Sequence, residues 1–340
     1  MSIEKETADR AGAVSILMAV HDQADELRRN LPVLLSQNYA PGYEVIVVDE
    51  SSTDDTDDVL TQLKAQYPQL YTTYIPASSH YVSRKKLALT LGMKAAHHEW
   101  VIITEATCRP ESDKWIEAMS EGMTETHDVV CAYTAFDEGT KGRYAFLRMV
   151  NWRRQLYHNF RYDGACLALR KTVFMQRNGF LRNLQFLRGE FDFLVNETPC
   201  ERVCLLTTAE SRMRQEEPTV KSWGNAQLYY MQTRSHLART TLSRVSFVAR
   251  QLLLHLSYIA AIGAIVVGAY LPQPVAMAVG TAMLPVLVAV RTWIAQKRLH
   301  ALGEHIAAWK LPALDLGVAW HYAYFKCRYL MADKYDFKRK

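Results

Sequence analysis

The stretch EVIVVDESSTDDT, residues 44–56, contains the signals that decide the fold. Residues 45–48 are all apolar, as in a strand buried inside a sheet. Asp49 and Glu50 end this run, and the hydroxyl and carboxyl residues of 51–55 follow it. These residue types cap a helix and complement the dipole at its N-terminus. The stretch therefore predicts a buried strand that leads directly into a helix.

The same alternation of strand and helix continues on both sides of this stretch. VSILMAV, residues 14–20, is another apolar run, and a helical pattern of leucines follows it. Residues 71–75 and 100–104 are further predicted strands, separated by a basic-fronted helical pattern over residues 84–97. Strands that alternate with helices pair in parallel through right-handed crossovers. We therefore predict an α/β fold with a doubly wound, mostly parallel sheet, whose ligands bind beyond the carboxyl ends of the strands.

The composition argues against several other classes of protein. The net charge is +5, from 40 Lys and Arg against 35 Asp and Glu, which is too small an excess to indicate nucleic-acid binding. The six cysteines lack paired metal-ligand spacing, so we interpret them as small core residues. The N-terminus, MSIEKETADR, is charged and precedes only seven apolar residues, too few for a secretory signal. We expect the first two-thirds of the chain to be cytoplasmic.

A charge-free stretch follows the irregular region of residues 110–246, in which strands are expected at 128–133 and 202–206. Between Arg250 and Arg291 there are 40 residues without Asp, Glu, Lys or Arg. A helix of about 20 residues spans the hydrocarbon core of a bilayer. Two membrane-spanning helices are therefore predicted, at about 251–270 and 275–294, and a pair of buried core helices is the alternative.

Basic residues on both flanks orient this hairpin. Positive charge near the ends of spanning helices favours the cytoplasmic side, and the flanking residues are Arg239, Arg244, Arg250, Arg291, Lys297 and Arg298. The last segment, 309–330, mixes Trp, Tyr and Leu with Lys and Arg. It is equally compatible with a helix in the membrane interface and with a packed amphipathic helix.

Carboxylates, rather than glycines, occupy the predicted strand ends. No G-x-G-x-x-G follows the first strand, where the sequence is AVHDQ, and there is no P-loop motif. Asp49 and Glu50 end the second strand and Glu105 ends the fourth. Carboxylates at this edge of a parallel sheet can accept hydrogen bonds from a nucleoside or hold a divalent cation against a pyrophosphate.

Four blocks of the sequence together resemble family 2 glycosyltransferases, the large inverting group with the GT-A fold. They are VSILMAVHDQADELRRNLPVLLSQNY with EVIVVDESSTDDT, then KKLALTLGMKAAHHEWVIITEATCRP, DGACLALRKTVFMQRNGF and RGEFDFLVN, in the family's order from residue 14 to about 235. The resemblance implies a GT-A domain with a Rossmann-like nucleotide-binding half over residues 1–240. A transmembrane hairpin over 241–297 and a cytoplasmic or interfacial helical tail over 298–340 would follow, as in bacterial membrane-anchored members.

The resemblance also implies roles for individual residues. The nucleotide side would contain Ala19, Val20, Asp22, Asp49, Glu105 and either Lys86 or its basic neighbours Arg84 and Lys85. Glu105 and Thr107 stand where the family has its metal-binding Asp-x-Asp pair. Glu190 or Asp192 stands at the position of the general base. The diphosphate or acceptor side would contain Arg109, Gly164, Arg214, Lys221 and Trp223.

Several of these residues have a competing structural interpretation. Asp54 and Asp55 fit helix capping better than ligand binding, and Glu190 with Asp192 could be a solvated surface pair. Lys221 and Trp223 fit a structural or membrane-facing role at least as well as a catalytic one.

Departures from the family pattern refine the expected activity. Thr107 replaces a carboxylate, which predicts weakened binding of Mg²⁺ or Mn²⁺, and the Gln-x-x-Arg-Trp motif of processive members is absent. We therefore expect a single sugar to move from a nucleotide-sugar, a UDP-sugar by resemblance, to a hydroxyl of a lipid-linked or polysaccharide-precursor acceptor. This would happen at the cytoplasmic face of the bacterial inner membrane, with membrane lipid as a further partner. The alternatives are a degenerate, non-catalytic membrane scaffold or nucleotide-binding protein and, less consistently with residues 164–179, a nucleotidyltransferase.

Overall fold

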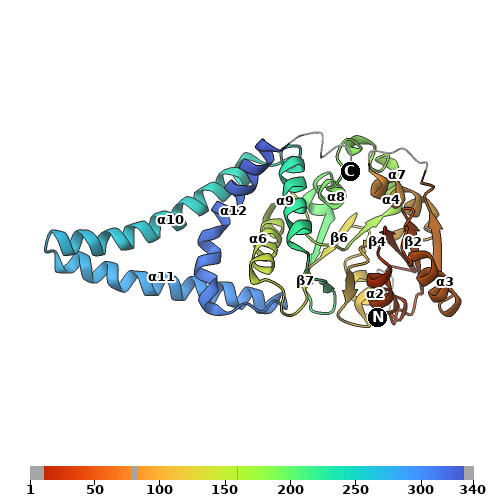
Figure 1. Ribbon diagram of the computed structural model, residues 1–340, viewed down its shortest axis with the longest axis horizontal. Coiled ribbons are helices and arrows are strands. Elements are labelled where there is room, and N and C mark those ends of the chain that lie inside the picture. Colours follow the sequence, from red (N-terminus) through yellow and green to blue (C-terminus); the bar gives the residue numbers. More distant parts are fainter. Residues whose placement is uncertain (1–10, 78–82, 159, 333–340) are drawn as a thin grey trace, which may run out of the picture. The chain divides into compact units, whose positions relative to one another are not determined.

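The computed structural model describes residues 11–77, 83–158 and 160–332, and the chain divides into two compact units (Figure 1). The first unit contains residues up to 137 together with 151–237, and the second contains 138–150 together with 238–331. The boundary thus falls within helix α6, Gly142–His158.

The first unit is built on a seven-stranded mixed sheet with the strand order β3-β2-β1-β4-β8-β6-β9. The strands β3, β2, β1 and β4 are parallel, and β8 is antiparallel to both of its neighbours, β4 and β6. The strands are β1 (Val14–Val20), β2 (Tyr43–Asp49), β3 (Leu70–Tyr74), β4 (Trp100–Thr104), β6 (Val129–Ala132), β8 (Leu167–Arg170) and β9 (Val203–Leu206). The predicted doubly wound, mostly parallel sheet is confirmed.

Helices connect the parallel strands in the predicted way. They are α2 (Ala24–Leu35), α3 (Thr56–Gln66) and α4 (Arg84–Ala95). Gly92 allows α4 to lie close to β1, since a Cβ atom at this position would be 2.0 Å from Leu17 Cδ1. The direction in which the N-terminal lysines of α4 point therefore depends on this close packing.

A smaller, three-stranded sheet lies beyond the end of β4, in the order β5-β10-β7. Its strands are β5 (Cys108–Pro110), β10 (Met213–Gln215) and β7 (Thr134–Phe136). The remaining α-helices of this unit are α5 (Trp115–Ser120), α7 (Lys171–Gln176), α8 (Glu190–Asn196) and α9 (Val220–Arg234). The turn 105–107 joins the large sheet to the small one, so it is held from both sides.

The interpretation of all six cysteines as core residues needs correction. Cys108, Cys131 and Cys166 are buried in the first unit, whereas Cys200 and Cys327 are exposed and Cys204 is intermediate. Cys200 begins a single turn of 3₁₀-helix, Cys200–Arg202, and Cys327 lies in the last helix, α12. Neither position belongs to a buried strand, which is why size and polarity alone misplaced them.

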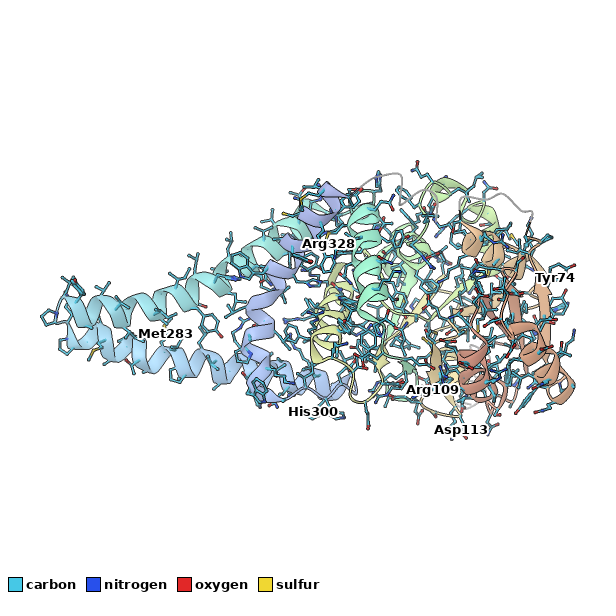
Figure 2. All side chains as sticks on the ribbon, in the orientation of Figure 1. Tyr74, Arg109, Asp113, Met283, His300 and Arg328 are labelled. Carbon is cyan, nitrogen blue, oxygen red and sulfur yellow. The ribbon has the colours of Figure 1, made fainter. Side chains whose placement is uncertain are left out.

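The second unit contains a helical hairpin of α10 (Thr241–Tyr270) and α11 (Pro274–Ala301). The two helices pack closely, since a Cβ atom on Gly268 would lie 2.5 Å from the Met277 backbone nitrogen. Both are long and apolar enough to cross a membrane, and only 17% and 6% of their most apolar windows are buried. Met283, labelled in Figure 2, is one of the exposed apolar residues of α11. Core helices of a soluble protein are mostly buried, so this exposure favours membrane spans over the alternative.

The last helix, α12 (Leu311–Met331), follows a short 3₁₀ turn, Ala308–Lys310. The rings of Trp320 and His255 of α10 meet edge to face with centroids 6.5 Å apart, and an ion pair joins Asp315 to Arg291 of α11. Trp309 and Trp320 are nevertheless 77% and 70% exposed. The helix therefore combines packing against the hairpin with the exposed tryptophans expected at a membrane interface.

Candidate active site

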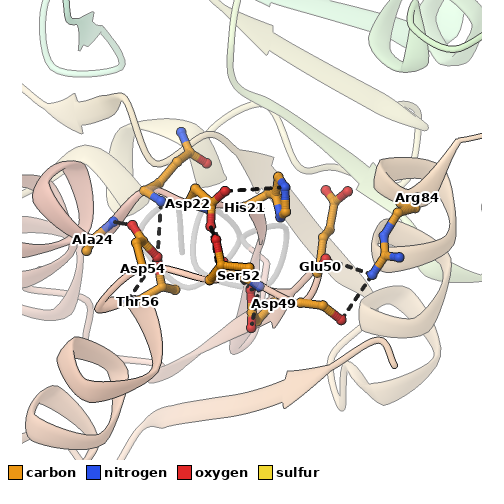
Figure 3. A network of polar contacts seen from close by, with 12 residues as sticks. His21, Asp22, Ala24, Asp49, Glu50, Ser52, Asp54, Thr56 and Arg84 are labelled. Carbon is orange, nitrogen blue, oxygen red and sulfur yellow. Dashed lines mark hydrogen bonds and ion pairs between the residues drawn. The ribbon is translucent and has the colours of Figure 1, made fainter. Parts of the chain in front are cut away.

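Hydrogen bonds join the ends of β1 and β2 (Figure 3). Both carboxylate oxygens of Asp49 accept from the Ser52 backbone N–H, at 3.0 and 3.2 Å, and Ser52 Oγ donates to Oδ1 at 2.5 Å. Asp22 accepts from the Thr53 backbone N–H at 2.7 Å, which lowers the pKa of its carboxyl group. The two strand ends therefore form one connected, acidic rim.

The backbone of this rim is strained at two positions. Asp22 and Ser51 have φ angles of 50° and 62°, a left-handed conformation that non-glycine residues rarely adopt. Strain of this kind persists where surrounding contacts fix the backbone, and it concentrates at functional sites.

Of the two predicted capping residues, Asp54 makes the capping hydrogen bonds. It accepts from the first N–H groups of two helices, Ala24 of α2 at 3.0 Å and Thr56 of α3 at 3.1 Å.

The basic start of α4 faces this rim through Arg84 and Lys85. Arg84 Nη2 donates to the Glu50 backbone oxygen at 2.7 Å and to Ser51 Oγ at 3.1 Å (Figure 3). Lys85 Nζ donates to Glu105 Oε1 at 2.7 Å. Lys85 thus links α4 to the turn at the end of β4.

Lys86 takes a different direction from the one that the resemblance implies. Its side chain is fully buried, and Nζ donates to the backbone oxygens of Asn183 and Phe186 at 2.6 Å each. Burial lowers the pKa of this amine to about 8, although Glu190 acts in the opposite direction. Lys86 therefore anchors the segment that precedes α8, and its neighbour Lys85 is the lysine that reaches the strand ends.

Helix α8 brings two carboxylates into the first unit. Gly189, with φ 91°, precedes it, and a Cβ atom there would lie 2.8 Å from Thr233 Cγ2. Glu190 and Asp192 are each only 5% exposed, so they are not a solvated surface pair. Among the described residues, Glu190 Oε1 has no hydrogen-bond partner. A buried carboxylate oxygen of this kind can accept a proton or a hydrogen bond from a ligand.

Asp192 is engaged elsewhere. Its Oδ1 accepts from Arg161 Nε at 3.2 Å and from the Tyr162 backbone N–H at 3.0 Å. Arg161 in turn lies over the Tyr230 ring, 3.6 Å from the centroid. Burial raises the pKa of Asp192, and Arg161 partly offsets that effect. Of the two candidates for the general base, the geometry favours Glu190 and gives Asp192 a supporting role in the core.

Five charged residues interact at the strand ends, and we call them the strand-end cluster: Glu50, Lys85, Glu105, Arg188 and Glu190. Desolvation acts to lower the pKa of Lys85, but Glu105 and Glu190 outweigh it, so the pKa is raised. Desolvation raises the pKa of Glu50 against the opposing effect of Lys85 and Arg188. Perturbed groups of both signs gathered beyond parallel strands are typical of a ligand site.

Arg109 and Arg214, expected on the diphosphate side, have carboxylate partners in the three-stranded sheet. Arg109, labelled in Figure 2, pairs with Asp137 at 2.6 Å, and Arg214 pairs with Glu111. Arg214 Nη1 also donates to the Phe136 backbone oxygen at 2.7 Å. Both arginines therefore hold the small sheet together.

The other residues expected on the diphosphate or acceptor side, and those at the end of β1, have mostly structural surroundings. Trp223 is buried against Phe136, and Lys221 is exposed at the start of α9. Gly164 leaves room for Tyr162, whose hydroxyl oxygen would lie 2.2 Å from a Cβ there. At the end of β1, Ala19 and Val20 are buried in the sheet.

The expected metal ligands do not fit a divalent cation well. Glu105 Oε1 accepts from Lys85, and Gln215 Nε2 lies 3.4 Å from both Glu105 Oε2 and Thr107 Oγ1. Hard cations need several oxygen ligands with free lone pairs, whereas both positions here face N–H donors. In the part of the chain that the structure describes, no three His, Cys, Asp or Glu side chains are grouped to hold a metal.

Sequence reasoning did not single out Arg188, and it did not predict that Gln215 lies next to Glu105 and Thr107. Arg188 immediately precedes the acidic segment, and a basic residue beside a candidate base was an available signal. Gln215 lies in β10, and its approach to Thr107 depends on the pairing of β10 with β5. No local sequence pattern predicts that pairing of β10 with β5.

The mixed sheet, with a charged cluster beyond its parallel strand ends and a buried carboxylate beside it, has the arrangement expected of a GT-A glycosyltransferase. The family model for glycosyl transferase family 2 matches residues 15–183, which include Asp49, Lys85 and Glu105 and end before α8. The chain belongs to this family of glycosyltransferases. No curated protein matches the chain by sequence.

Two solved structures of low sequence identity align with this chain over most of its length. The mannosyltransferase PcManGT from Pyrobaculum calidifontis, in complex with GDP-Man and Mn²⁺, has a TM-score of 0.54 and 16% identity, over 92% of this chain and 87% of that one. S. aureus TarS 1-349, in complex with UDP, has a TM-score of 0.48 and 13% identity, over 95% and 93%. At this identity, the likeness to PcManGT shows the fold alone.

Proposed function

We propose that the chain transfers one sugar, with inversion, from a UDP-sugar to a hydroxyl of a lipid-linked or polysaccharide-precursor acceptor. The observation that carries the proposal is Glu190: it is 5% exposed, its Oε1 has no partner among the described residues, and it interacts with Lys85 and Arg188. These features support a general base held next to the cations that would face a nucleotide diphosphate.

In this mechanism the acceptor oxygen attacks the anomeric carbon as Glu190 removes its proton. The bond from the anomeric carbon to the diphosphate oxygen breaks on the opposite face, and the nucleoside diphosphate leaves with the bonding electrons. Positive groups near the leaving oxygen stabilise the charge that develops there. Asp49 and Asp22, on the acidic rim, are the proposed contacts for the nucleoside.

A divalent cation is part of the expectation from the family, and PcManGT was solved with Mn²⁺. In this chain such a cation would have to displace Lys85 from Glu105, where the two side chains are 2.7 Å apart. The proposed transfer therefore contains no step that depends on a metal.

The two apolar helices support a location at the bacterial inner membrane, with the transferase unit in the cytoplasm. Basic residues flank both ends of the hairpin, as expected for ends that stay on the cytoplasmic side. The corresponding division of the chain is a transferase domain over 1–240, a hairpin over 241–297 and a tail over 298–340. Resistance of the full chain to extraction from membranes by alkaline carbonate tests this location, and release into the supernatant would contradict it.

Calorimetric titration of the detergent-solubilised chain with UDP and GDP tests the nucleotide site. We expect UDP to bind and a screen of nucleotide-sugars for hydrolysis to name the donor. Asp49→Ala and Glu105→Ala are expected to abolish turnover while leaving the melting temperature close to that of the parent. Failure to bind either nucleotide would favour the non-catalytic scaffold instead.

A further inference from the structure

The two positions at which the family would bind a metal already have nitrogen donors from the protein. Lys85 Nζ donates to Glu105 at 2.7 Å, and Gln215 Nε2 faces both Glu105 and Thr107 at 3.4 Å. An N–H group that points at a carboxylate occupies the lone pair that a cation would use, and an ammonium also repels the cation.

Lys85 is held in this position by the structure around it. Its side chain is 16% exposed, and Nζ lies 5.8 Å from the centroid of the Phe191 ring. Helix α4 is capped by Ser83, whose Oγ accepts from the Lys86 backbone N–H and donates to the Leu187 backbone oxygen at 3.1 Å. The helix that carries Lys85 is therefore fixed to the segment that carries Arg188 and Glu190.

The charge of Lys85 and Arg188 together equals that of one divalent cation. Lys85 contacts Glu105 and acts electrostatically on Glu190, and the exposed Arg188 acts electrostatically on Glu190, Glu105 and Glu50, so both cations influence the same carboxylates. A diphosphate that enters beside them would find two positive groups, each able to donate charge-assisted hydrogen bonds.

We propose that Lys85, assisted by Arg188, replaces the divalent cation of this family and neutralises the departing diphosphate, so that the enzyme works without a metal. This inference rests on the proposed function. Glu105 then orients the Lys85 ammonium instead of binding a metal. During transfer Lys85 stays protonated, since the acceptor proton goes to Glu190 and the electron pair of the broken bond goes to the diphosphate.

The first test uses Mn²⁺ alone and needs no activity. Electron paramagnetic resonance of Mn²⁺ titrated into the full chain should show free ion in the parent and in Lys94→Ala, an exposed lysine of the same helix. In Lys85→Ala, Glu105 loses its donor and the bound Mn²⁺ fraction should rise. Stoichiometric Mn²⁺ binding by the parent in the absence of nucleotide would overturn the proposal.

The second test measures UDP and GDP binding by calorimetry in a chelator and again with Mn²⁺. The parent should bind its nucleotide with the same affinity in both, and Lys85→Ala should bind about tenfold or more weakly in the chelator. Lys94→Ala should match the parent, and unchanged melting temperatures would show that the variants fold.

The outcomes separate this inference from the function on which it rests. If the parent binds nucleotide only with Mn²⁺, or if Lys85→Ala binds nucleotide as tightly as the parent, the proposal that Lys85 replaces the metal is wrong. The proposed glycosyltransferase function would not be affected by either result. No binding of either nucleotide under any condition would overturn the proposed function and this inference with it.

Discussion

The strand-end cluster and the three-stranded sheet contain the same types of charged residue but pair them differently. In the small sheet, Arg109 pairs with Asp137 at 2.6 Å and Arg214 pairs with Glu111. Glu216, which follows β10, binds Arg29 at 2.9 Å. In the strand-end cluster, three carboxylates share two cations, and Glu190 keeps an oxygen with no partner among the described residues.

This difference separates charges that build the fold from charges held available for a ligand. A carboxylate whose oxygens already accept hydrogen bonds from arginines has little left to offer a substrate. Groups that share partners and are desolvated retain unmet interactions that a ligand can supply. The comparison predicts that substitutions in the cluster change chemistry, whereas those in the small sheet change stability.

The largest effect is expected for Glu190→Gln. It removes the proposed base but keeps the size of the side chain, so sugar transfer should fall by about 10²- to 10⁴-fold. Nucleotide affinity and melting temperature should stay close to those of the parent. Single-turnover transfer measures the change, and Glu197→Gln, just after the same helix, serves as the control. A parent-like rate would remove Glu190 from the mechanism.

Asp192→Ala, two residues further on, should act on stability instead. It removes one of the two carboxylates that pair with the buried Arg161, which keeps Asp163, and it removes the acceptor of the Tyr162 backbone N–H, which should cost about 1–3 kcal/mol in free energy of unfolding. Chemical denaturation in detergent measures this cost, and Arg161→Met with Asp192→Ala should recover part of it. A variant as stable as the parent but catalytically inactive would move Asp192 into the strand-end cluster and break the comparison.

Arg109→Ala should have a smaller effect, confined to the small sheet. The pair with Asp137 is partly exposed, so its loss should cost about 1 kcal/mol or less in free energy of unfolding. Affinity for UDP should not change. A tenfold loss of that affinity would restore Arg109 to the diphosphate side.

The smallest effects are opposite pH dependences of stability for Glu216 and Glu50. Burial raises the pKa of Glu216, but hydrogen bonds from Arg29 and Asn30 outweigh it and bring the pKa below 4.5. Its ionised form is therefore favoured in the folded state, and this stability is present above about pH 4.5 and lost as the pH falls through the lowered pKa.

For Glu50, desolvation raises the pKa above 4.5, so the folded state binds a proton that the unfolded state has lost. Stability from this group therefore falls as the pH rises from 4.5 through the raised pKa. Denaturation curves of Glu216→Gln and Glu50→Gln against the parent should show slopes of opposite sign. Slopes of the same sign would mean that the carboxylate beside the three-stranded sheet and the one in the strand-end cluster have the same pH dependence of stability, which contradicts the comparison.

The sheet could be predicted from the sequence because its strands are local. Each is a short apolar run followed by polar residues, as at 44–56, and the runs predict β1, β2 and β4 within two residues. The position of Glu105 at a strand end followed from the same pattern. The direction in which each α4 lysine points could not be predicted, because the side chains of adjacent helical residues point in directions about 100° apart around the helix axis. Packing of Gly92 against Leu17 fixes that rotation.

The partners of the arginines in the three-stranded sheet could not be predicted from the sequence, for a different reason. Arg109 and Asp137 are 28 residues apart, and Arg212 and Glu111 are 101 apart. Such pairs form only when β5, β7 and β10 assemble into one sheet, and three-residue strands leave almost no periodic signal. Arg109 and Arg214 were therefore predicted to contact a ligand, although in the structure they form ion pairs with Asp137 and Glu111.

The two carbonyls that receive the Lys86 amine belong to residues 97 and 100 positions further along the chain. A ribosome adding about 5–20 residues per second completes the strands that carry Asp49 and Glu105 several seconds before those carbonyls exist. During that interval Lys86 has no such acceptors and can remain hydrated. The strand ends proposed to bind the nucleotide are thus synthesised before Glu190, the proposed base, which reaches them only when the segment that ends at Glu190 docks.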